Sequence, residues 1–286
     1  MNGALLVDKP AGVTSHDVVA IARRALGTKS VGHTGTLDPF ATGLLVLLIG
    51  KATRLARFLD GFEKVYVATV RLGASSDTDD STGTLTPGGP ATRDSRPGRE
   101  EIAAALAGFV GTQLQMPPAF SAKKIDSQRA YARARKGEEV VLKPATVTIH
   151  SIELLKYEWP DVELRAAVST GTYIRSLARD LGTKLGMVAH CAALRREAIG
   201  RFRTTDARTL EELQDGKATV GLTMAELVAH LPKQELDAEG IAHIKHGRKV
   251  PTTMTAGPFA LVQGGELLAI AEVVEGMAQP TVVLAE

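Results

Sequence analysis

The sequence is poor in the features that define several common classes of protein. Its 286 residues include one cysteine, Cys191, so no disulfide can close within the chain, and this fits a reducing compartment. No apolar run approaches the ~20 residues of a membrane span. The opening segment lacks the basic flank of a secretory signal. We therefore expect a cytoplasmic protein with no membrane segment.

Several standard catalytic motifs are also missing. Gly50 and Lys51 are followed by Ala52, so they do not form a Walker loop, and neither GxGxxG nor GxSxG occurs. The histidines and the cysteine show neither C-x-x-C nor HExxH spacing. Asp77 and Asp79 resemble the start of a calcium loop, but Thr82 stands where that loop needs glycine. These absences argue against metal catalysis.

Charge is nearly balanced overall but uneven along the chain. The 34 basic and 32 acidic residues give a net charge of +2. Two basic clusters stand out, one within 120–137 and one formed by the arginines at 195, 196, 201 and 203. Each cluster is open to two interpretations, a solvated face or a local phosphate-binding surface.

Local patterns predict the first elements. Thr14 and Asp17 have capping-box spacing ahead of a helix over about Ser15–Leu26. The glycine-rich stretch Gly32–Gly43 predicts an ordered loop, and the apolar run Leu44–Ile49 predicts a strand buried on both faces. Alternation over 64–72 predicts a strand with Tyr66 on its buried face.

The later elements follow by the same rules. We expect a loop over Ala74–Arg99, and capping boxes at Thr209/Glu212 and Thr223/Glu226. Further predicted elements are helices at 100–109, 174–181 and 237–246, a strand at 162–169, a hairpin turning at Gly264-Gly265 and a last strand at 281–284. Pro232 marks the best candidate domain boundary, followed by a small β-rich region.

One acidic residue has an unusual setting. Asp38 lies in the glycine-rich loop just before the buried strand, and Pro39 restricts the backbone after it. Reactive groups are often carried on loops held by a rigid scaffold. An aspartate before proline also commonly forms a turn, so spacing alone leaves both interpretations open. A glycosidase would need a second, paired carboxylate.

Six segments in order resemble one enzyme family. They are DKPAGVTSHDVV, GHTGTLDPFATGLLVLLIGKATR, KVYVATVRLGASSDTDDSTG, MPPAFSAKKIDSQRAYARARKGE, STGTYIRSLARDLG and AALRREAIGRF. Together they are similar to the motifs of tRNA pseudouridine synthases of the bacterial pseudouridine-55 type. The resemblance runs from Asp8 to about Phe202.

The resemblance implies a fold and a division into domains. The fold class would be α+β, with a mixed, largely antiparallel sheet flanked by helices. Residues 1–230 would form the catalytic domain, with an RNA-clamping insertion at about 115–140. Residues 231–286 would form a small β-rich, PUA-like RNA-binding domain. Ser127, where many relatives carry glycine, and a long stretch over Thr86–Arg99 depart from the family pattern.

The implied activity is conversion of uridine to pseudouridine in the T-arm loop of tRNA, at position 55. The base would be flipped out, its bond from N1 to the ribose broken, and the ribose rejoined through C5. The implied partner is the tRNA T-arm stem-loop, with no cofactor, no membrane and no obligate protein partner, and the protein would be a monomer.

The resemblance also assigns roles to single residues. Asp38 would be the essential carboxylate, Tyr66 would stack on the base and accept the C5 proton, and Arg175 would pair with Asp38 and hold it ionised. Without the family, Tyr66 would be a core residue and Arg175 a surface one. The implied substrate-binding residues are Lys9, His33, Lys123, Lys124, Arg129, Tyr173 and Leu194.

Two rival functions fit much of the same sequence. One is a tRNA-binding or RNA-folding factor for which binding rather than turnover matters. The other is a guide-RNA-dependent pseudouridine synthase that acts within a complex. The intact set of Asp38, Tyr66 and Arg175 favours an enzyme, and the basic insertion favours one that acts alone.

Overall fold

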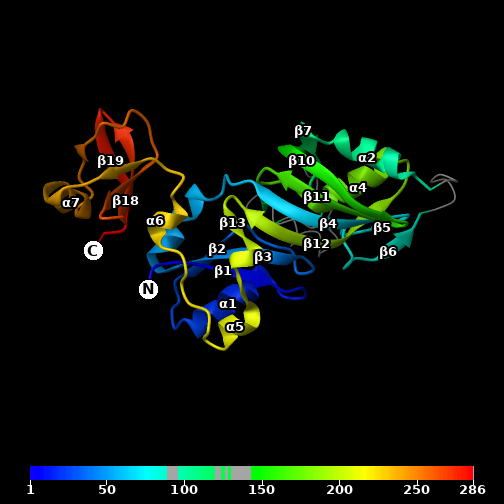
Figure 1. Cartoon of the computed structure of the whole chain (residues 1–286), viewed down its shortest axis with the longest axis horizontal. Helices are drawn as coiled ribbons and strands as arrows, with labels where there is room; N and C mark the ends of the chain where they lie inside the picture. Colours follow the sequence, from blue (N-terminus) through cyan, green and yellow to red (C-terminus); the bar gives the residue numbers. More distant parts are fainter. Residues whose placement is uncertain (89–95, 120–123, 126–127, 130–142, 286) are drawn as a thin grey trace.

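The computed structural model describes residues 1–88, 96–119, 124–125, 128–129 and 143–285 (Figure 1). Within them, a ten-stranded sheet has the path β14-β1-β3-β12-β4-β11-β10-β7, with β13 beside β12 and β2 beside β3. Its strands are β1 (Gly3–Lys9), β2 (Val31–Thr34), β3 (Thr42–Ile49), β4 (Lys64–Leu72), β7 (Gly111–Gln115), β10 (Ala145–Glu158), β11 (Asp161–Val168), β12 (Ala189–Ile199), β13 (Phe202–Arg203) and β14 (Arg208–Thr209). The β1–β14 and β3–β12 pairs are parallel and the others antiparallel, which confirms the predicted mixed, largely antiparallel sheet.

Helices cover this sheet. They are α1 (Ser15–Ala25), α2 (Arg99–Ala107), α4 (Ile174–Lys184), α5 (Leu210–Gln214) and α6 (Met224–Leu227), with 3-10 helices η1 (Gly50–Phe58) and η2 (Thr204–Asp206). In Figure 1, α1 and α5 lie below β1 and β3, whereas α2 and α4 lie toward the opposite end of the sheet. All three predicted capping boxes form, and α1 ends one residue before the predicted Leu26.

Strand β3 is apolar from Leu44 to Ile49 because it lies between two hydrophobic clusters. Its even-numbered side chains from Leu44 to Leu48 join one hydrophobic cluster, whereas Leu45, Leu47 and Ile49 join a second cluster with α1. Because strand side chains alternate between faces, a strand between two cores is apolar at every position. The prediction of burial on both faces is confirmed, and β4 buries the predicted face that carries Tyr66.

Two predicted loops contain more structure than expected. The first residues of the stretch Gly32–Gly43 belong to β2, which pairs with β3. The segment predicted as a loop over Ala74–Arg99 contains the hairpin of β5 (Ala74–Ser76) and β6 (Leu85–Pro87). Its serine, threonine and aspartate side chains bond to one another instead of to solvent, so a polar composition did not mean an irregular chain.

A second sheet follows near the carboxyl end. Its order is β15-β17-β18-β19-β16, with α7 (Ala238–Lys245) beside it (Figure 1). The strands are β15 (Lys233–Glu235), β16 (Val250–Pro251), β17 (Phe259–Gln263), β18 (Glu266–Val274) and β19 (Met277–Val283). Gly264 and Gly265 have φ of 54° and 86°, which confirms the predicted primed turn of the β17–β18 hairpin.

The second sheet shares a hydrophobic cluster with the first. Val262, Ile270 and Val282 pack in one cluster with Leu55 and Leu59 of the first part of the chain. Side chains of η1 also donate to β19 and the residue after it: Lys51 to the Leu284 carbonyl at 2.8 Å, and Arg57 to Thr281 at 3.2 Å. The two sheets are therefore joined by both apolar and polar contacts.

No helix in the described part of the chain is long and apolar enough to cross a membrane.

Candidate active site

A cavity of about 270 Å³ opens where several segments converge, among them the residues Leu59 and Asp60 that follow η1. It is lined by the loop after β2, by β4, by β12 and by the turn that leads into α4. Strand pairing places Tyr66 of β4 opposite Arg196 of β12, and Lys64 opposite Ile199. Opposed residues of an antiparallel pair lie on the same face, so these side chains form one wall.

The acidic loop enters this cavity with its backbone held on both sides of Asp38. Ser15 accepts from the Leu37 amide at 2.9 Å and donates to the Leu37 carbonyl at 3.2 Å. On the other side, the Lys9 ammonium donates to the carbonyls of Pro10, Val13 and Pro39. Asp38 is 36% exposed at its side chain, so its carboxylate reaches the cavity while its loop is fixed.

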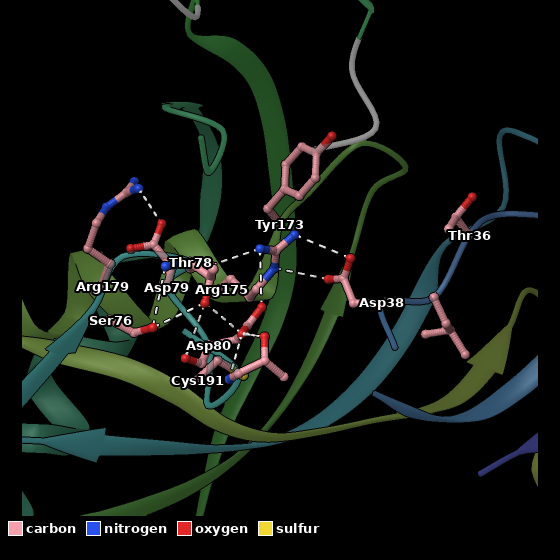
Figure 2. A network of polar contacts seen from close by, with 12 residues as sticks. Thr36, Asp38, Ser76, Thr78, Asp79, Asp80, Tyr173, Arg175, Arg179 and Cys191 are labelled. Atoms are coloured by element: carbon pink, nitrogen blue, oxygen red, sulfur yellow. Dashed lines mark hydrogen bonds and ion pairs between the residues drawn. The ribbon is translucent and has the colours of Figure 1, made fainter. Parts of the chain in front are cut away.

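Arg175, at the start of α4, meets this carboxylate (Figure 2). Nε lies 2.9 Å from Asp38 Oδ2, and Nη2 lies 3.3 Å from Oδ1. The arginine side chain is only 5% exposed, which makes it a buried residue and not a surface one. The pair that the resemblance implied is present, with one hydrogen bond from Nη2 and with Nε at ion-pair distance from the other carboxylate oxygen.

A second carboxylate holds the far side of Arg175. Nη1 lies 3.3 Å from Asp80 Oδ2 and donates to the Thr78 carbonyl at 2.8 Å. Asp80 is 6% exposed, and its Oδ1 accepts from the Thr82 hydroxyl at 2.6 Å, the Thr82 amide at 2.9 Å and the Thr78 hydroxyl at 2.8 Å. Figure 2 shows Arg175 lying between the two carboxylates.

The turn that carries Asp80 is itself fixed to the sheet. Asp79 has a φ of 59°, its carboxylate pairs with Arg179 of α4 at 2.9 Å, and its carbonyl accepts from the Cys191 amide of β12 at 2.9 Å. An aspartate in the left-handed region is uncommon and is stabilised here by these contacts. The turn therefore presents Asp80 to Arg175 in one orientation.

Burial and the neighbouring charges shift the pKa of Asp38 in different directions. Burial raises the pKa of the Asp38 carboxyl above its ordinary value, Arg175 lowers it and the Asp80 charge raises it. The net direction is upward, and Arg175 is the main group that favours the ionised form. The carboxyl keeps a proton to a higher pH than an exposed aspartate would.

Comparisons with known proteins match this chain along most of its length. Residues 23–174 match the model of the TruB family pseudouridylate synthase (N terminal domain), and residues 175–232 match the tRNA pseudouridylate synthase B C-terminal domain. The chain belongs to the TruB family.

Two curated TruB-family relatives and one solved structure illustrate the similarity. The tRNA pseudouridine synthase B of Thermobifida fusca (strain YX) is 45% identical over 293 residues, covering 99% of both chains. That of Leifsonia xyli subsp. xyli (strain CTCB07) is 43% identical over 282 residues, covering 95% of this chain and 92% of the relative. The archaeal box H/ACA sRNP Nop10-Cbf5 complex contains a chain 26% identical, with a TM-score of 0.72 over 98% of this chain and 85% of that one.

Other residues named from the TruB-family resemblance fall into two groups. Tyr66, Tyr173 and Leu194 line the cavity with Asp38, and Tyr66 is 7% exposed. His33, on β2, is outside the cavity lining and meets His16 edge to face at a ring distance of 5.7 Å.

The basic candidates are distributed differently. Lys9 is 0% exposed and its ammonium donates to three backbone carbonyls, so here it is directed at the protein; that it binds substrate stays a prediction. Lys123 lies outside the described residues. Lys124 and Arg129 pair through their backbones in the two-residue strands β8 (Lys124–Ile125) and β9 (Gln128–Arg129), and their side chains lie outside the description.

The second basic cluster is not one surface of this TruB-family protein. Arg195 makes two hydrogen bonds to the Asp8 carboxylate, at 3.0 and 2.6 Å. Arg196 is 1% exposed, and Arg201 and Arg203 donate to backbone carbonyls. The interpretation of this cluster as a phosphate-binding surface is therefore wrong for Arg196.

Asp80 is the site residue that sequence analysis missed. It lay in a stretch whose composition predicted a loop, beside acids that were considered only as calcium ligands. A signal was present, because Thr78 and Thr82 stand two residues on either side of it and both can donate to its carboxylate. A buried carboxylate needs hydrogen-bond donors, and these two threonines supply them.

Proposed function

We propose that this protein converts a uridine of tRNA into pseudouridine, and that the uridine lies in the T-arm loop. The observation that carries the proposal is the Asp38 carboxylate at the cavity, held from behind by Arg175 and sharing the cavity with Tyr66. Family membership and the printed names of the TruB relatives support the reaction type.

The chemistry suits a carboxylate without a second paired acid. The bond between N1 and the ribose C1′ breaks, the uracil turns in place, and C5 bonds to C1′. The C5 proton is then lost to a base and N1 gains a proton, so the product is an isomer of the substrate. Asp38 acts at the ribose or the base, and Arg175 orients it.

The other cavity residues hold the extracted base. Tyr66 stacks on the uracil and is the proposed acceptor of the C5 proton, while Leu194 closes the apolar side and Tyr173 packs the wall. Enzymes that act on a base within folded RNA must first remove it from the stack. The reaction also needs a pocket that retains the free uracil between bond breaking and bond formation.

The proposal also covers the RNA partner, the division into domains and the cellular location. Residues 1–230 form the catalytic domain and 231–286 a small PUA-like RNA-binding domain. Lys123, Lys124 and Arg129 contact the phosphates of the T-arm, with His33 beside the loop. The protein acts as a cytoplasmic monomer without a protein partner, in line with relatives named as enzymes in their own right.

The test is an Asp38→Asn variant assayed for tritium release from tRNA labelled at uridine C5. We expect turnover to disappear while tRNA binding remains, because the substitution keeps the shape and removes the charge. Asp161→Asn, which removes the charge of an exposed ion pair with Arg71, is the matched control and keeps turnover. Turnover near normal in Asp38→Asn would refute the assignment.

A second assay separates the rival functions. Purified protein is mixed with a naked T-arm stem-loop and the pseudouridines are mapped. Product without added RNA or protein excludes a guide-dependent enzyme. Activity only with added partners would show that the proposed monomeric enzyme is wrong. No product under either condition, with tight binding, would favour a folding factor.

A further inference from the structure

Arg196 lies inside the protein and joins the two ends of the Asp38 loop. It projects from β12, and its Nε donates to the Leu44 carbonyl at 2.8 Å, at the start of the buried run of β3. Its Nη2 donates to the Gly35 carbonyl at 2.9 Å, and its Nη1 reaches the Thr36 carbonyl at 3.5 Å. One planar guanidinium thus connects the backbone before Asp38 to the backbone after it.

Two glycines lie where the ends of the Asp38 loop approach Arg196. A Cβ on Gly43 would lie 2.2 Å from the backbone oxygen of Arg196, and Gly43 has a φ of +101°. A Cβ on Gly35, at a φ of +70°, would lie 3.5 Å from Arg196 Nη1. Gly43 allows β3 to approach β12 closely, and Gly35 provides the positive φ with which the loop turns toward Arg196.

The position is unfavourable for a cation on stability grounds alone. Arg196 is 1% exposed, and in the described parts of the chain its hydrogen-bond partners are carbonyls, with no ion pair to a carboxylate. Two further cations lie close: Lys9 and Lys64 both have a pKa lowered to about 8, mainly by burial and in part by the Arg196 charge. Taking a cation out of water is costly, and here no carboxylate of the described residues offsets that cost.

We propose that Arg196 is a positioning residue for the reaction, acting through the loop that carries Asp38. Its guanidinium bonds to both ends of the loop and so fixes the distance between them. That distance sets the position of the Asp38 carboxylate relative to Tyr66 and Arg175. The inference rests on the proposed role of Asp38. Misplacing a reacting group by about 1 Å can reduce a rate about 100-fold. Lysine keeps the charge but cannot supply three donors in one plane.

The test compares Arg196→Lys and Arg196→Met with Arg195→Lys as matched control. Arg195 is the preceding residue on the same strand, 41% exposed at its side chain and paired with Asp8. We measure the single-turnover rate, the tRNA dissociation constant and the melting temperature. We expect Arg196→Lys to lose roughly 10- to 100-fold in rate with tRNA affinity unchanged, whereas Arg195→Lys keeps its rate.

Chemical rescue separates positioning from a structural role. In Arg196→Ala, millimolar guanidinium chloride should restore part of the rate, because the free cation can occupy the vacated site and donate to the same carbonyls. Ionic strength is matched with sodium chloride, since RNA binding depends on salt. The same addition should not restore Asp38→Asn, which lacks the carboxylate itself.

Three results would overturn the inference. They are a wild-type rate in folded Arg196→Lys, a loss explained entirely by weaker tRNA binding, and unfolding of both Arg196→Lys and Arg196→Met. In each of these cases an inactive Asp38→Asn leaves the proposed function standing. An active Asp38→Asn removes that function whatever Arg196 does.

Discussion

Arg175 meets Asp38 along the edge of its guanidinium, with Nε 2.9 Å from Oδ2 and Nη2 3.3 Å from Oδ1. The two side chains differ in exposure, 5% for the arginine and 36% for the aspartate. The cation therefore holds the carboxylate from the protein side and leaves its other face to the cavity. A substrate can approach Asp38 without displacing its partner.

Replacing Arg175 by lysine should reduce turnover at least tenfold, with tRNA affinity within about twofold of wild type. A single ammonium cannot meet both oxygens of Asp38 and also reach Asp80, and charged hydrogen bonds contribute about 1.5–3 kcal/mol each. Single-turnover kinetics and filter binding measure the two quantities. If Arg175→Lys turned over as fast as wild type, the contact of one guanidinium with both oxygens of Asp38 would be dispensable.

Asp80→Asn should lower turnover by about an order of magnitude, because Arg175 loses a charged partner and becomes free to shift. The effect falls on the rate and not on the affinity, since Asp80 is buried behind the arginine. Asp77→Asn is the control: Asp77 is an exposed acid on the same turn that accepts from the Thr84 amide. Matching losses in both variants would mean that the turn, and not the Asp80 charge, matters.

On the acid side of the pH–rate profile, the rate should begin to fall at a pH above the ordinary pKa of an aspartate. Burial raises the pKa of Asp38, and the ionised form needed for activity is lost as the pH falls through that raised value. Because the Asp80 charge contributes to the rise, Asp80→Asn should move the acid limb to lower pH. Arg175→Met should move it to higher pH, since Arg175 lowers the pKa. Profiles of kcat/KM against pH for wild type, Asp80→Asn and Arg175→Met measure these shifts. Acid limbs at the same pH in all three proteins would contradict the prediction.

Lys9→Met should destabilise the fold by about 1–3 kcal/mol at pH 7, because three carbonyls lose a donor. The loss should grow as the pH rises from about 8 toward 10.5. In that window the folded wild type, with a pKa of about 8, has released the proton that the unfolded chain still binds, so wild-type stability increases with pH. Urea unfolding at several pH values measures it. Lys29→Met, which removes an exposed lysine, is the control.

The two sheets should unfold together. Val282, 5% exposed, lies in the cluster that contains Leu55 and Leu59 beside the first sheet, so a charge at Val282 disturbs the packing of both sheets. Val282→Asp should lower the unfolding free energy by about 3 kcal/mol or more. Val274→Asp, at a position 40% exposed in the same sheet, should change it by about 0.5 kcal/mol at most. Calorimetry should give one transition in wild type, and two separated transitions would refute this coupling.

Each pattern read correctly from the sequence was a local one. The capping box at Thr14, the alternation around Tyr66 and the paired glycines at 264 and 265 each predict structure within a few residues, because helix, strand and turn geometry repeat over that range. The apolar run of β3 likewise predicted burial on both faces. The family resemblance then supplied Asp38 and Arg175 as a pair before any contact was known.

The tertiary structure alone decided which charged residues are buried and what they face. Asp80 and Arg175 lie on a turn and a helix far apart in the chain, and they meet because the turn bridges to β12 and the helix, α4, packs against the same strand. Lys9 and Arg196 are ordinary surface residue types, yet both are buried against backbone carbonyls beside the Asp38 loop. Strand order brings these groups together, and no local periodicity encodes strand order, so the support of the Asp38 loop could be seen only once the chain was folded.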